Sequence, residues 1–328
     1  MNRNYIDMHC DTLMAAYLAD GVRADLYDIG AMVNIRKLIE GKTLAQFFAI
    51  FIVPGEYYSA HGMEQIPEEK YINDCYRLYN SNLNRYKGLM AKAENYDDII
   101  NNANRGMLSS ILTMEDGVTV HGNMNRLDLY YEMGIRALAL TWNYANCFGS
   151  PNSTDKKVMS KGLTDFGKDA VRHMQDIGML VDVSHLSDGG FWDVVRICKK
   201  PFIASHSNCR SVCDNPRNLT DNQIEALGTM GGVMGLNFCP AFLNRDRHDD
   251  NSRVESLVAM AKQARKCGGI DVVAIGSDFD GIGGNLEIDG PDKMELLFDG
   301  LSKAGFSDDD IDKVAYKNVM RVIREAVR

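Results

Sequence analysis

Short apolar segments recur along the whole chain, and they predict a sheet of eight strands. Each segment is rich in β-branched and aromatic residues and is bounded by polar or glycine-containing stretches, as is typical of strands. Their hydrophobicity is nearly continuous rather than alternating, which indicates strands covered on both faces, as in a parallel sheet. The predicted strands are residues 6–10, 45–53, 109–115, 137–142, 179–184, 201–206, 231–238 and 271–278.

Helical segments lie between many of these predicted strands. Thr164 and Thr220 each precede an aspartate and are predicted N-caps, whereas Gly178 and Gly268 are predicted to end helices. The C-terminal segment begins with acidic residues and ends with basic ones, which matches the dipole of a helix. Eight strands that alternate with helices favour a (β/α)8 barrel over an open sheet.

No repeat, low-complexity tract or linker divides the chain, so residues 1–328 are expected to form a single barrel domain. The 328 residues exceed the ~250 that are typical of this fold. The excess is expected in residues 12–44 and in long loops at 143–162 and 239–251. In such barrels the active site lies where the loops leave the C-terminal ends of the strands.

Residues of the kind that bind metals close four of the apolar segments. These residues are His9, Asp11, Glu115, His185 and His206. Apolar segments normally exclude such groups, because burying an unpaired charge or imidazole costs free energy. Since all of them fall at the C-terminal ends of predicted strands, we expect their side chains to converge on one metal centre.

The spacing of these residues suggests how the metal centre is shared. His9 and Asp11 are two positions apart, so their side chains point the same way on an extended strand. His185 and His206 end consecutive strands that one short helical connection joins, so they are expected side by side. Glu115 can use both carboxylate oxygens and is the natural bridge, although the adjacent Asp116, facing the opposite way, is an alternative.

Five ligands are too many for one tetrahedral catalytic zinc that keeps a position open for water. They suit two Zn²⁺ ions bridged by Glu115, with His9 and Asp11 on one ion and His185 and His206 on the other. Two ions ~3.5–4 Å apart acidify a bridging water and polarise a substrate oxygen, which is hydrolytic chemistry.

The last predicted strand ends in a further pair of carboxylates, Asp278 and Asp280. Asp278 lies at the strand end, where it could orient the bridging water or pass its proton to a leaving amine. Asp280 either takes that role or shapes the loop.

Charge and composition restrict the partners of the protein. The net charge of −9 and the pI of about 5.3 argue against nucleic acid or an anionic membrane as the main partner. The first residues lack the apolar stretch of a signal peptide, and no apolar run is as long as a transmembrane helix. We therefore expect a cytoplasmic protein that acts on a small molecule.

Taken together and in this order, the motifs resemble the membrane dipeptidase (renal dipeptidase) family of binuclear zinc peptidases, from about residue 5 to residue 323. The matching segments are DMHCDT, ILTMEDG, LTWN, LVDVSHLSD, FIASHSNCRSVCDNPRN, VAIGSDFDG and KNVMRVI. The resemblance implies that the five strand-end residues are the zinc ligands. It also implies that Arg217 binds the C-terminal carboxylate of a dipeptide and that Asp278 lies near the metal-bound water. Family members often accept a C-terminal D-residue, and several are homodimers.

One position departs from the family pattern. Many mammalian relatives have a histidine directly after the L-T-L-T stretch, where it helps to hold the substrate carbonyl oxygen, and here that position is Trp142. The indole N–H of Trp142 could donate one hydrogen bond. Asn143 or Asn146 could instead supply the donor to the oxyanion.

Two other functions are compatible with a metal-containing barrel. One is a different binuclear amidohydrolase, such as an N-acyl-amino-acid deacetylase or a lactonase. Those barrels more often begin with H-x-H and bridge their metals with a carboxylated lysine, whereas this chain has H-x-D and Glu115. The other is a catalytically silent barrel that binds a ligand, which the intact ligand set argues against. We favour dipeptide hydrolysis.

Overall fold

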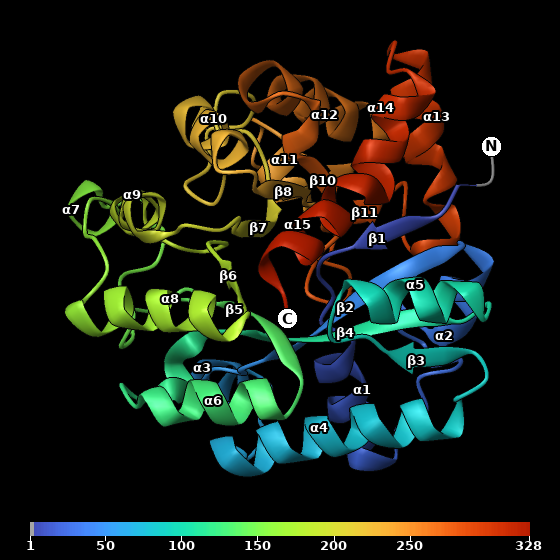
Figure 1. The fold of residues 1–328 in the computed structure, drawn as a ribbon, viewed down its shortest axis with the longest axis vertical. Coiled ribbons are helices and arrows are strands. Elements are labelled where there is room, and N and C mark those ends of the chain that lie inside the picture. Colours follow the sequence, from blue (N-terminus) through green and yellow to red (C-terminus); the bar gives the residue numbers. More distant parts are fainter. Residues whose placement is uncertain (1–2) are drawn as a thin grey trace.

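The computed structural model describes residues 3–328 and shows a closed barrel of parallel strands surrounded by helices (Figure 1). Around the barrel the order is β2-β1-β10-β8-β7-β6-β5-β4, and the pairing of β2 with β4 closes the ring. The eight barrel strands are β1 (Tyr5–Asp7), β2 (Thr43–Phe51), β4 (Leu108–Glu115), β5 (Ile135–Ala139), β6 (Leu180–Asp182), β7 (Ile203–Ser207), β8 (Val233–Leu236) and β10 (Val273–Ile275).

All eight predicted strands are confirmed, and the fold is the predicted (β/α)8 barrel. The register is clearest between β2 and β4, which pair from Ala45 with Ser109 to Phe51 with Glu115. Every residue of β4 is buried. This burial on both faces explains why the barrel strands have continuous rather than alternating hydrophobicity.

Three short strands were not predicted, because they are too short to carry a hydrophobic pattern. Strand β3 (Met90–Lys92) pairs with the beginning of β4 and is not part of the closed ring. Strands β9 (Asn251–Ser252) and β11 (Asn285–Leu286) form a separate two-stranded sheet. The latter two strands belong to the loops that follow β8 and β10.

Helices occupy the connections between the strands (Figure 1). Their bounds are α1 (Thr12–Asp20), α2 (Ile35–Glu40), α3 (Gly55–Ala60), α4 (Glu68–Arg85), α5 (Tyr96–Asn104), α6 (Met124–Glu132), α7 (Lys156–Met159), α8 (Asp165–Ile177), α9 (Asp188–Ile197), α10 (Asp221–Thr229), α11 (Pro240–Leu243), α12 (Val254–Gly268), α13 (Glu295–Lys303), α14 (Asp308–Asp312) and α15 (Asn318–Ala326). The expected excess at residues 12–44 therefore contains two helices, α1 and α2.

The predicted helix ends are confirmed with one shift. Thr164 accepts a hydrogen bond from the backbone of α8, and Thr220 forms a reciprocal capping box at the start of α10. Gly178 ends α8 in the left-handed region, with φ 88°. Gly268 is the last residue of α12, and Gly269, with φ 79°, ends the helix instead.

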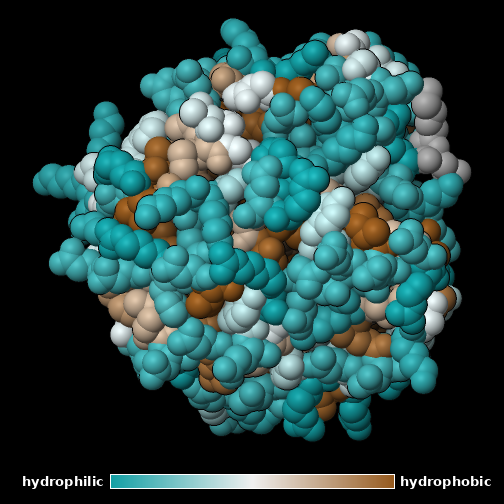
Figure 2. Space-filling view, in the orientation of Figure 1, coloured by the Kyte–Doolittle hydropathy of each residue, from teal (hydrophilic) through white to brown (hydrophobic). Residues whose placement is uncertain are grey.

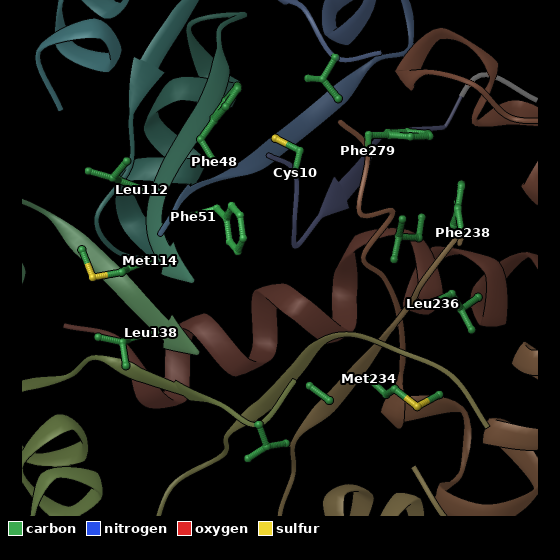
Figure 3. Packing of buried hydrophobic residues seen from close by; sticks show 14 of the residues in the cluster. Cys10, Phe48, Phe51, Leu112, Met114, Leu138, Met234, Leu236, Phe238 and Phe279 are labelled. Carbon is green, nitrogen blue, oxygen red and sulfur yellow. The ribbon is translucent and has the colours of Figure 1, made fainter. Parts of the chain in front are cut away.

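The hydrophobic core has two layers. The inner layer fills the barrel with residues such as Ile6, Phe47 and Ile111, and residues of α15 including Val322 and Ile323 pack against it. Figure 1 shows α15, in red, lying across the middle of the ring of strands. The outer layer lies between the strands and the surrounding helices, and Figure 3 shows part of it.

The face of the molecule shown in Figure 2 is mostly hydrophilic, with hydrophobic residues in scattered small groups. Within residues 3–328, no helix has both the length and the apolar character that crossing a membrane requires.

Candidate metal centre and substrate cavity

The five predicted ligands meet at the C-terminal ends of β1, β4, β6 and β7. Glu115 lies between them. Its Oε2 is 3.3 Å from Nε2 of His9, whereas its Oε1 is 3.0 Å from Nε2 of His185 and 3.5 Å from Nε2 of His206. Each carboxylate oxygen therefore faces a different side of the centre, which is the arrangement that a bridging carboxylate requires.

Asp278 joins the side of the centre formed by His9 and Asp11. Nε2 of His9 is 3.5 Å from Oδ2 of Asp11 and 3.6 Å from Oδ1 of Asp278. Donor atoms of these three residues lie within 4.8 Å of one another, as do those of His9, Glu115 and His206. The structure thus places Asp278 within reach of a metal ion on this side.

The polar atoms of the centre fit a divalent cation. Nε2 of His9 and Oδ1 of Asp11 are buried without a hydrogen-bond partner. Nε2 of His185 and Nε2 of His206 face each other at 3.1 Å. Their Nδ1 atoms lie 3.1 Å from Oδ1 of Asn143 and 2.7 Å from Oγ of Ser205. If each Nδ1 donates its proton to that oxygen, both Nε2 atoms present lone pairs to the centre, as metal ligation by neutral histidine requires.

The pKa values show that buried carboxylates crowd one another at this centre. Burial, the largest cause, and the charge of Glu115 together raise the pKa of Asp278 to about 7 and that of Asp11 to about 6, although the charge of His9 acts in the opposite direction. Burial also opposes the ionisation of Glu115, but the charge of His9 outweighs it and holds the pKa well below its usual range. Burial lowers the pKa of His185 to about 4. Burial opposes the protonation of His9, but the charges of Glu115 and Asp11 outweigh it and hold the pKa of His9 well above its usual range. Imidazoles beside crowded carboxylates form a donor set that favours binding of a divalent cation.

The backbone is strained where it carries the site. His185 and Asp278 have φ values of 67° and 66°, in the left-handed region that residues other than glycine rarely adopt. Such strain costs ~1–3 kcal/mol at each position and is typical of functional sites. At Gly281 a Cβ atom would overlap Oδ2 of Asp11, so the loop after β10 approaches the centre as closely as only glycine allows.

Two asparagines that the sequence analysis missed hold Asp278. Nδ2 of Asn237 donates to Oδ2 of Asp278 at 2.8 Å, which leaves Oδ1 facing His9. Asn208 in turn donates to the carbonyl of Asn237 and accepts from its N–H. Asn237 is the second-last residue of the seventh predicted strand, residues 231–238, so a search for polar residues near strand ends could have found it as well.

Two buried aspartates were also missed, and each binds a serine on the neighbouring strand. The Asp182–Ser205 clamp joins β6 and β7: Ser205 donates its N–H to Oδ1 of Asp182 at 2.9 Å and its hydroxyl to Oδ2. The Asp7–Ser277 clamp joins β1 to the segment after β10: Ser277 donates its N–H at 2.8 Å and its hydroxyl at 2.6 Å. Both aspartates lie inside apolar runs rather than at their ends.

Arg217 is a buried cation beside the centre. It donates to the carbonyl of His206 at 3.0 Å and weakly to Ser207, and its Nε has no hydrogen-bond partner. Its guanidinium carbon is 5.4 Å from the ring centroid of Phe242. Among the described residues, no carboxylate forms an ion pair with Arg217. A buried guanidinium with this spare capacity is suited to bind an anion that enters the cavity.

The centre opens into a cavity of about 580 Å³, large enough for a small ligand. Of the predicted site residues, Asp11, Glu115, Trp142, Asn143, His185, Arg217 and Asp278 line it. Asn146 does not: its side chain donates to Asp116 and to the carbonyl of Leu140 and accepts from Phe148. The structure therefore gives no support to Asn146 as a donor to the substrate.

The two alternative carboxylates have structural contacts. Asp116 accepts from the N–H of Val118 at 2.9 Å and so caps the turn after β4. Asp280 accepts from the hydroxyl of Thr12 and the N–H of Met32, both at 2.6 Å, and ties the loop after β10 to the first connection. The geometry favours Glu115 over Asp116 and Asp278 over Asp280 as the residues that face the centre.

A (β/α)8 barrel with buried histidines and carboxylates at the C-terminal ends of its strands belongs to the class of metal-dependent hydrolases. The comparison with known families agrees, since residues 2–328 match the family described as membrane dipeptidase, peptidase family M19. This chain belongs to that family and is a metallopeptidase that hydrolyses dipeptides. The family match decides against the deacetylase, lactonase and silent-barrel alternatives.

Related sequences and solved structures are similar over most of the chain. An uncharacterized protein in the pqqA 5′ region of Klebsiella pneumoniae is 34% identical over 66% of this chain and 82% of its own length. Dipeptidase tcpJ of Claviceps purpurea is 25% identical over 91% of this chain and 70% of its own length. The crystal structure of dipeptidase AC, a metallopeptidase of family M19, covers 99% of each chain at 23% identity with a TM-score of 0.88.

A metallopeptidase from Rhodobacter sphaeroides, solved with a phosphinate mimic of the dipeptide L-Ala-D-Ala, has the same fold. It covers 99% of this chain and 100% of its own at 24% identity, with a TM-score of 0.88.

Proposed function

We propose that this dipeptidase uses two divalent cations. The imidazole and carboxylate donors favour Zn²⁺ as their identity. His9 and Asp11 would hold one ion, His185 and His206 the other, and Glu115 would bind both. The observation that carries this proposal is the orientation of Glu115, whose two oxygens face opposite sides of the centre at 3.0 to 3.5 Å from the three imidazoles. Imidazole and carboxylate donors suit zinc.

Bound cations at this place would lower the pKa of a water molecule and polarise the scissile carbonyl. Asp278 moves the proton. Because Asn237 occupies its Oδ2, Oδ1 is the oxygen that accepts a proton from the attacking water and delivers it to the amine nitrogen of the departing amino acid. The water oxygen forms the new C–O bond as the C–N bond breaks.

Arg217 selects the substrate by its carboxylate. In a buried site its N–H groups form strong, charge-assisted hydrogen bonds with a carboxylate close to the scissile bond. A dipeptide meets this requirement, whereas a longer peptide places its carboxylate too far away. The relative that was crystallised with an L-Ala-D-Ala mimic supports acceptance of a D-residue at the C-terminal position.

Metal analysis and a substrate panel test the proposal. The panel contains L,L and L,D dipeptides, the same dipeptides with a C-terminal amide, and a tripeptide. We expect about two zinc ions per chain, hydrolysis of the free dipeptides and a kcat/KM at least ~100-fold lower for the amides, because they lose the buried ion pair. Equal turnover of amides and acids would exclude the role of Arg217. One ion per chain at full activity would exclude the shared Glu115.

We further propose that residues 1–328 act as one hydrolase domain, in the cytoplasm and as a homodimer. The family match over residues 2–328 supports the single domain. The eight cysteines are all free, which fits a reducing compartment. The dimer rests on the resemblance to the family, and light scattering of the purified protein tests it.

A further inference from the structure

The cavity has two chemically different walls, which come from opposite sides of the barrel. Strands β2, β4 and β5 are consecutive in the ring, and so are β10, β8 and β7. Strand β1 separates the two groups on one side and β6 on the other. Each group sends its loops to the cavity, so the cavity residues that follow β2 and β5 face those that follow β7, β8 and β10.

The wall from the β2 and β5 side is aromatic. Phe51, the last residue of β2, and Trp142, in the loop after β5, have ring centroids 5.0 Å apart at an angle of 64°. Tyr144 extends this wall, with its ring 5.9 Å from that of Trp142. Tyr57 of α3 lines the cavity from the same side. The ring of Trp142 is 6.1 Å from that of His185, so the aromatic wall begins directly beside the metal centre.

Outside the five predicted ligands, the opposite wall carries the buried charged groups of the cavity, whereas Glu56, which lines the cavity on the aromatic side, is exposed. Arg217 follows β7, and Phe242, whose ring it faces, follows β8. Asp278 follows β10. A dipeptide whose carboxylate binds Arg217 and whose scissile carbonyl lies at Glu115 therefore has its C-terminal residue on this side. Its N-terminal residue, beyond the scissile carbonyl, extends towards the aromatic wall.

We propose that the aromatic wall of Phe51, Tyr57, Trp142 and Tyr144 makes the enzyme selective for dipeptides with a large apolar or aromatic N-terminal side chain. This inference rests on the proposed function, because it takes Arg217 as the anchor of the C-terminal carboxylate. Trp142 is the centre of the wall, since its ring contacts both Phe51 and Tyr144. Trp142, the residue that departs from the family pattern, would therefore bind substrate by apolar contact rather than by a hydrogen bond.

The physical basis is removal of apolar surface from water. A glycine or alanine at the N-terminal position leaves the aromatic rings exposed, whereas phenylalanine or leucine covers them. Apolar pockets change kcat/KM by ~10–200-fold between substrates that differ by one small apolar group. We therefore expect kcat/KM for Phe-Ala and Leu-Ala to exceed that for Gly-Ala by at least ~10-fold.

Trp142→Ala and Tyr144→Ala test the wall. The measured quantity is the ratio of kcat/KM for Phe-Ala to that for Gly-Ala, and we expect Trp142→Ala to lower this ratio by ~10-fold or more. Tyr144 is 49% exposed, so Tyr144→Ala tests the wall in a folded protein even if Trp142→Ala does not fold. The matched control is Tyr27→Ala, which removes half of a stacked tyrosine pair that does not line the cavity and should leave the ratio unchanged.

Reversed dipeptides test the orientation. The ratio of Ala-Phe to Ala-Gly should be the same in the wild type and in Trp142→Ala, because the C-terminal residue lies at the other wall. If the Ala-Phe ratio falls instead, or if both ratios are unaffected in both variants, the aromatic wall does not hold the N-terminal side chain. If the wild type hydrolyses no dipeptide at all, the proposed function fails first. Dipeptide turnover with equal rates for Phe-Ala and Gly-Ala refutes only the selectivity.

Discussion

Two places in the barrel hold a buried aspartate by the same contacts, the Asp7–Ser277 clamp and the Asp182–Ser205 clamp. In each, the aspartate is in register with an isoleucine of the neighbouring strand, and the serine lies two residues beyond that isoleucine. In each, the residue after the aspartate donates its N–H to the carbonyl of that isoleucine, at 3.0 Å and 2.8 Å. The same local solution therefore ties two pairs of strands together beneath the metal centre.

The two clamps differ in what the serine hydroxyl contacts next. Oγ of Ser205 is 2.7 Å from Nδ1 of His206, a candidate metal ligand. Oγ of Ser277 accepts from the N–H of Phe279 and lies 3.3 Å from the carbonyl of His9, so it contacts backbone alone. One clamp therefore fixes the ring of an imidazole as well as the strands, whereas the other fixes only the strands. Identical packing contacts can thus have a structural role at one place and a positioning role at another.

Glu115→Gln should have the largest effect on activity, because it removes the negative charge that the two sides of the metal centre share. Without bound metal, the contact of one clamp with a metal ligand no longer matters, so the clamps no longer differ in function. We expect loss of bound metal and of dipeptide hydrolysis to background, with the fold retained. Metal analysis, circular dichroism and a dipeptide assay measure the three properties. Glu132→Gln, at an exposed position of α6, is the control and should match the wild type. Full activity of Glu115→Gln would contradict the shared carboxylate.

Asp182→Asn and Asp7→Asn separate the clamps most sharply. In the wild type, the carboxylate of Asp182 can only accept a hydrogen bond. The Ser205 hydroxyl therefore donates to Asp182 and accepts from Nδ1–H of His206. An amide NH₂ group would instead donate to Ser205, whose hydroxyl would then turn to Nδ1 and leave the proton of the imidazole on Nε2. We expect Asp182→Asn to weaken metal binding by ~100-fold, at the upper end for such outer contacts.

Asp7→Asn provides the matched comparison. It should lower the free energy of unfolding by about 1–3 kcal/mol, as the loss of a buried hydrogen-bond acceptor does, and leave metal affinity near that of the wild type. Competition with a chelator measures the affinity, and urea unfolding measures the stability. Equal losses of metal affinity in the two variants would mean that the clamps do not differ in function.

Ser205→Ala and Ser277→Ala give a smaller version of the same contrast. Both remove a buried hydroxyl and should cost about 1–3 kcal/mol of stability. Only Ser205→Ala also frees the ring of His206, so its metal affinity should fall by ~10-fold, at the lower end for outer contacts. Isothermal titration with zinc compares the two. A loss of affinity in Ser277→Ala as large as that in Ser205→Ala would show that strand position, not the imidazole contact, matters.

Asn143→Ala should have the smallest effect. Oδ1 of Asn143 binds Nδ1 of His185 as Ser205 binds His206, but Asn143 is exposed, so water can replace it. We expect metal affinity to fall by less than ~10-fold and kcat to change little. Dipeptide kinetics at fixed zinc concentration measure both. A large fall in kcat with unchanged affinity would instead restore Asn143 as a donor to the substrate.

Most of the fold could be predicted from the sequence, because segments that are buried in the fold consist of apolar residues that are adjacent in the sequence. The eight barrel strands are continuous apolar runs, and the residues that close them were recognised as candidate ligands by their chemistry alone. The helix ends at Thr164, Thr220 and Gly178 follow from capping and backbone preferences that act within one turn. The strands β3, β9 and β11 were missed because two or three residues are too few to establish a period.

The contacts behind the ligands could not be predicted, since they join residues that are distant in sequence. Asp182 and Ser205 are neighbours only because of the register between β6 and β7, and Asn237 reaches Asp278 across β8 and β10. The choice of Asn143 rather than Asn146 at the cavity depends on how one loop folds, and no pattern in the loop distinguishes two asparagines.

By itself the sequence determined the barrel and the set of residues that could bind metal, because hydrophobic burial and donor chemistry belong to each residue and its near neighbours. The tertiary structure alone decided which oxygen of Glu115 faces which imidazole, which aspartate clamp reaches a ligand, and which wall of the cavity is aromatic. Those features depend on register, on the left-handed backbone at His185 and Asp278, and on the closure of the ring between β2 and β4. Each of these features depends on residues of different strands, which come into contact only in the packed barrel.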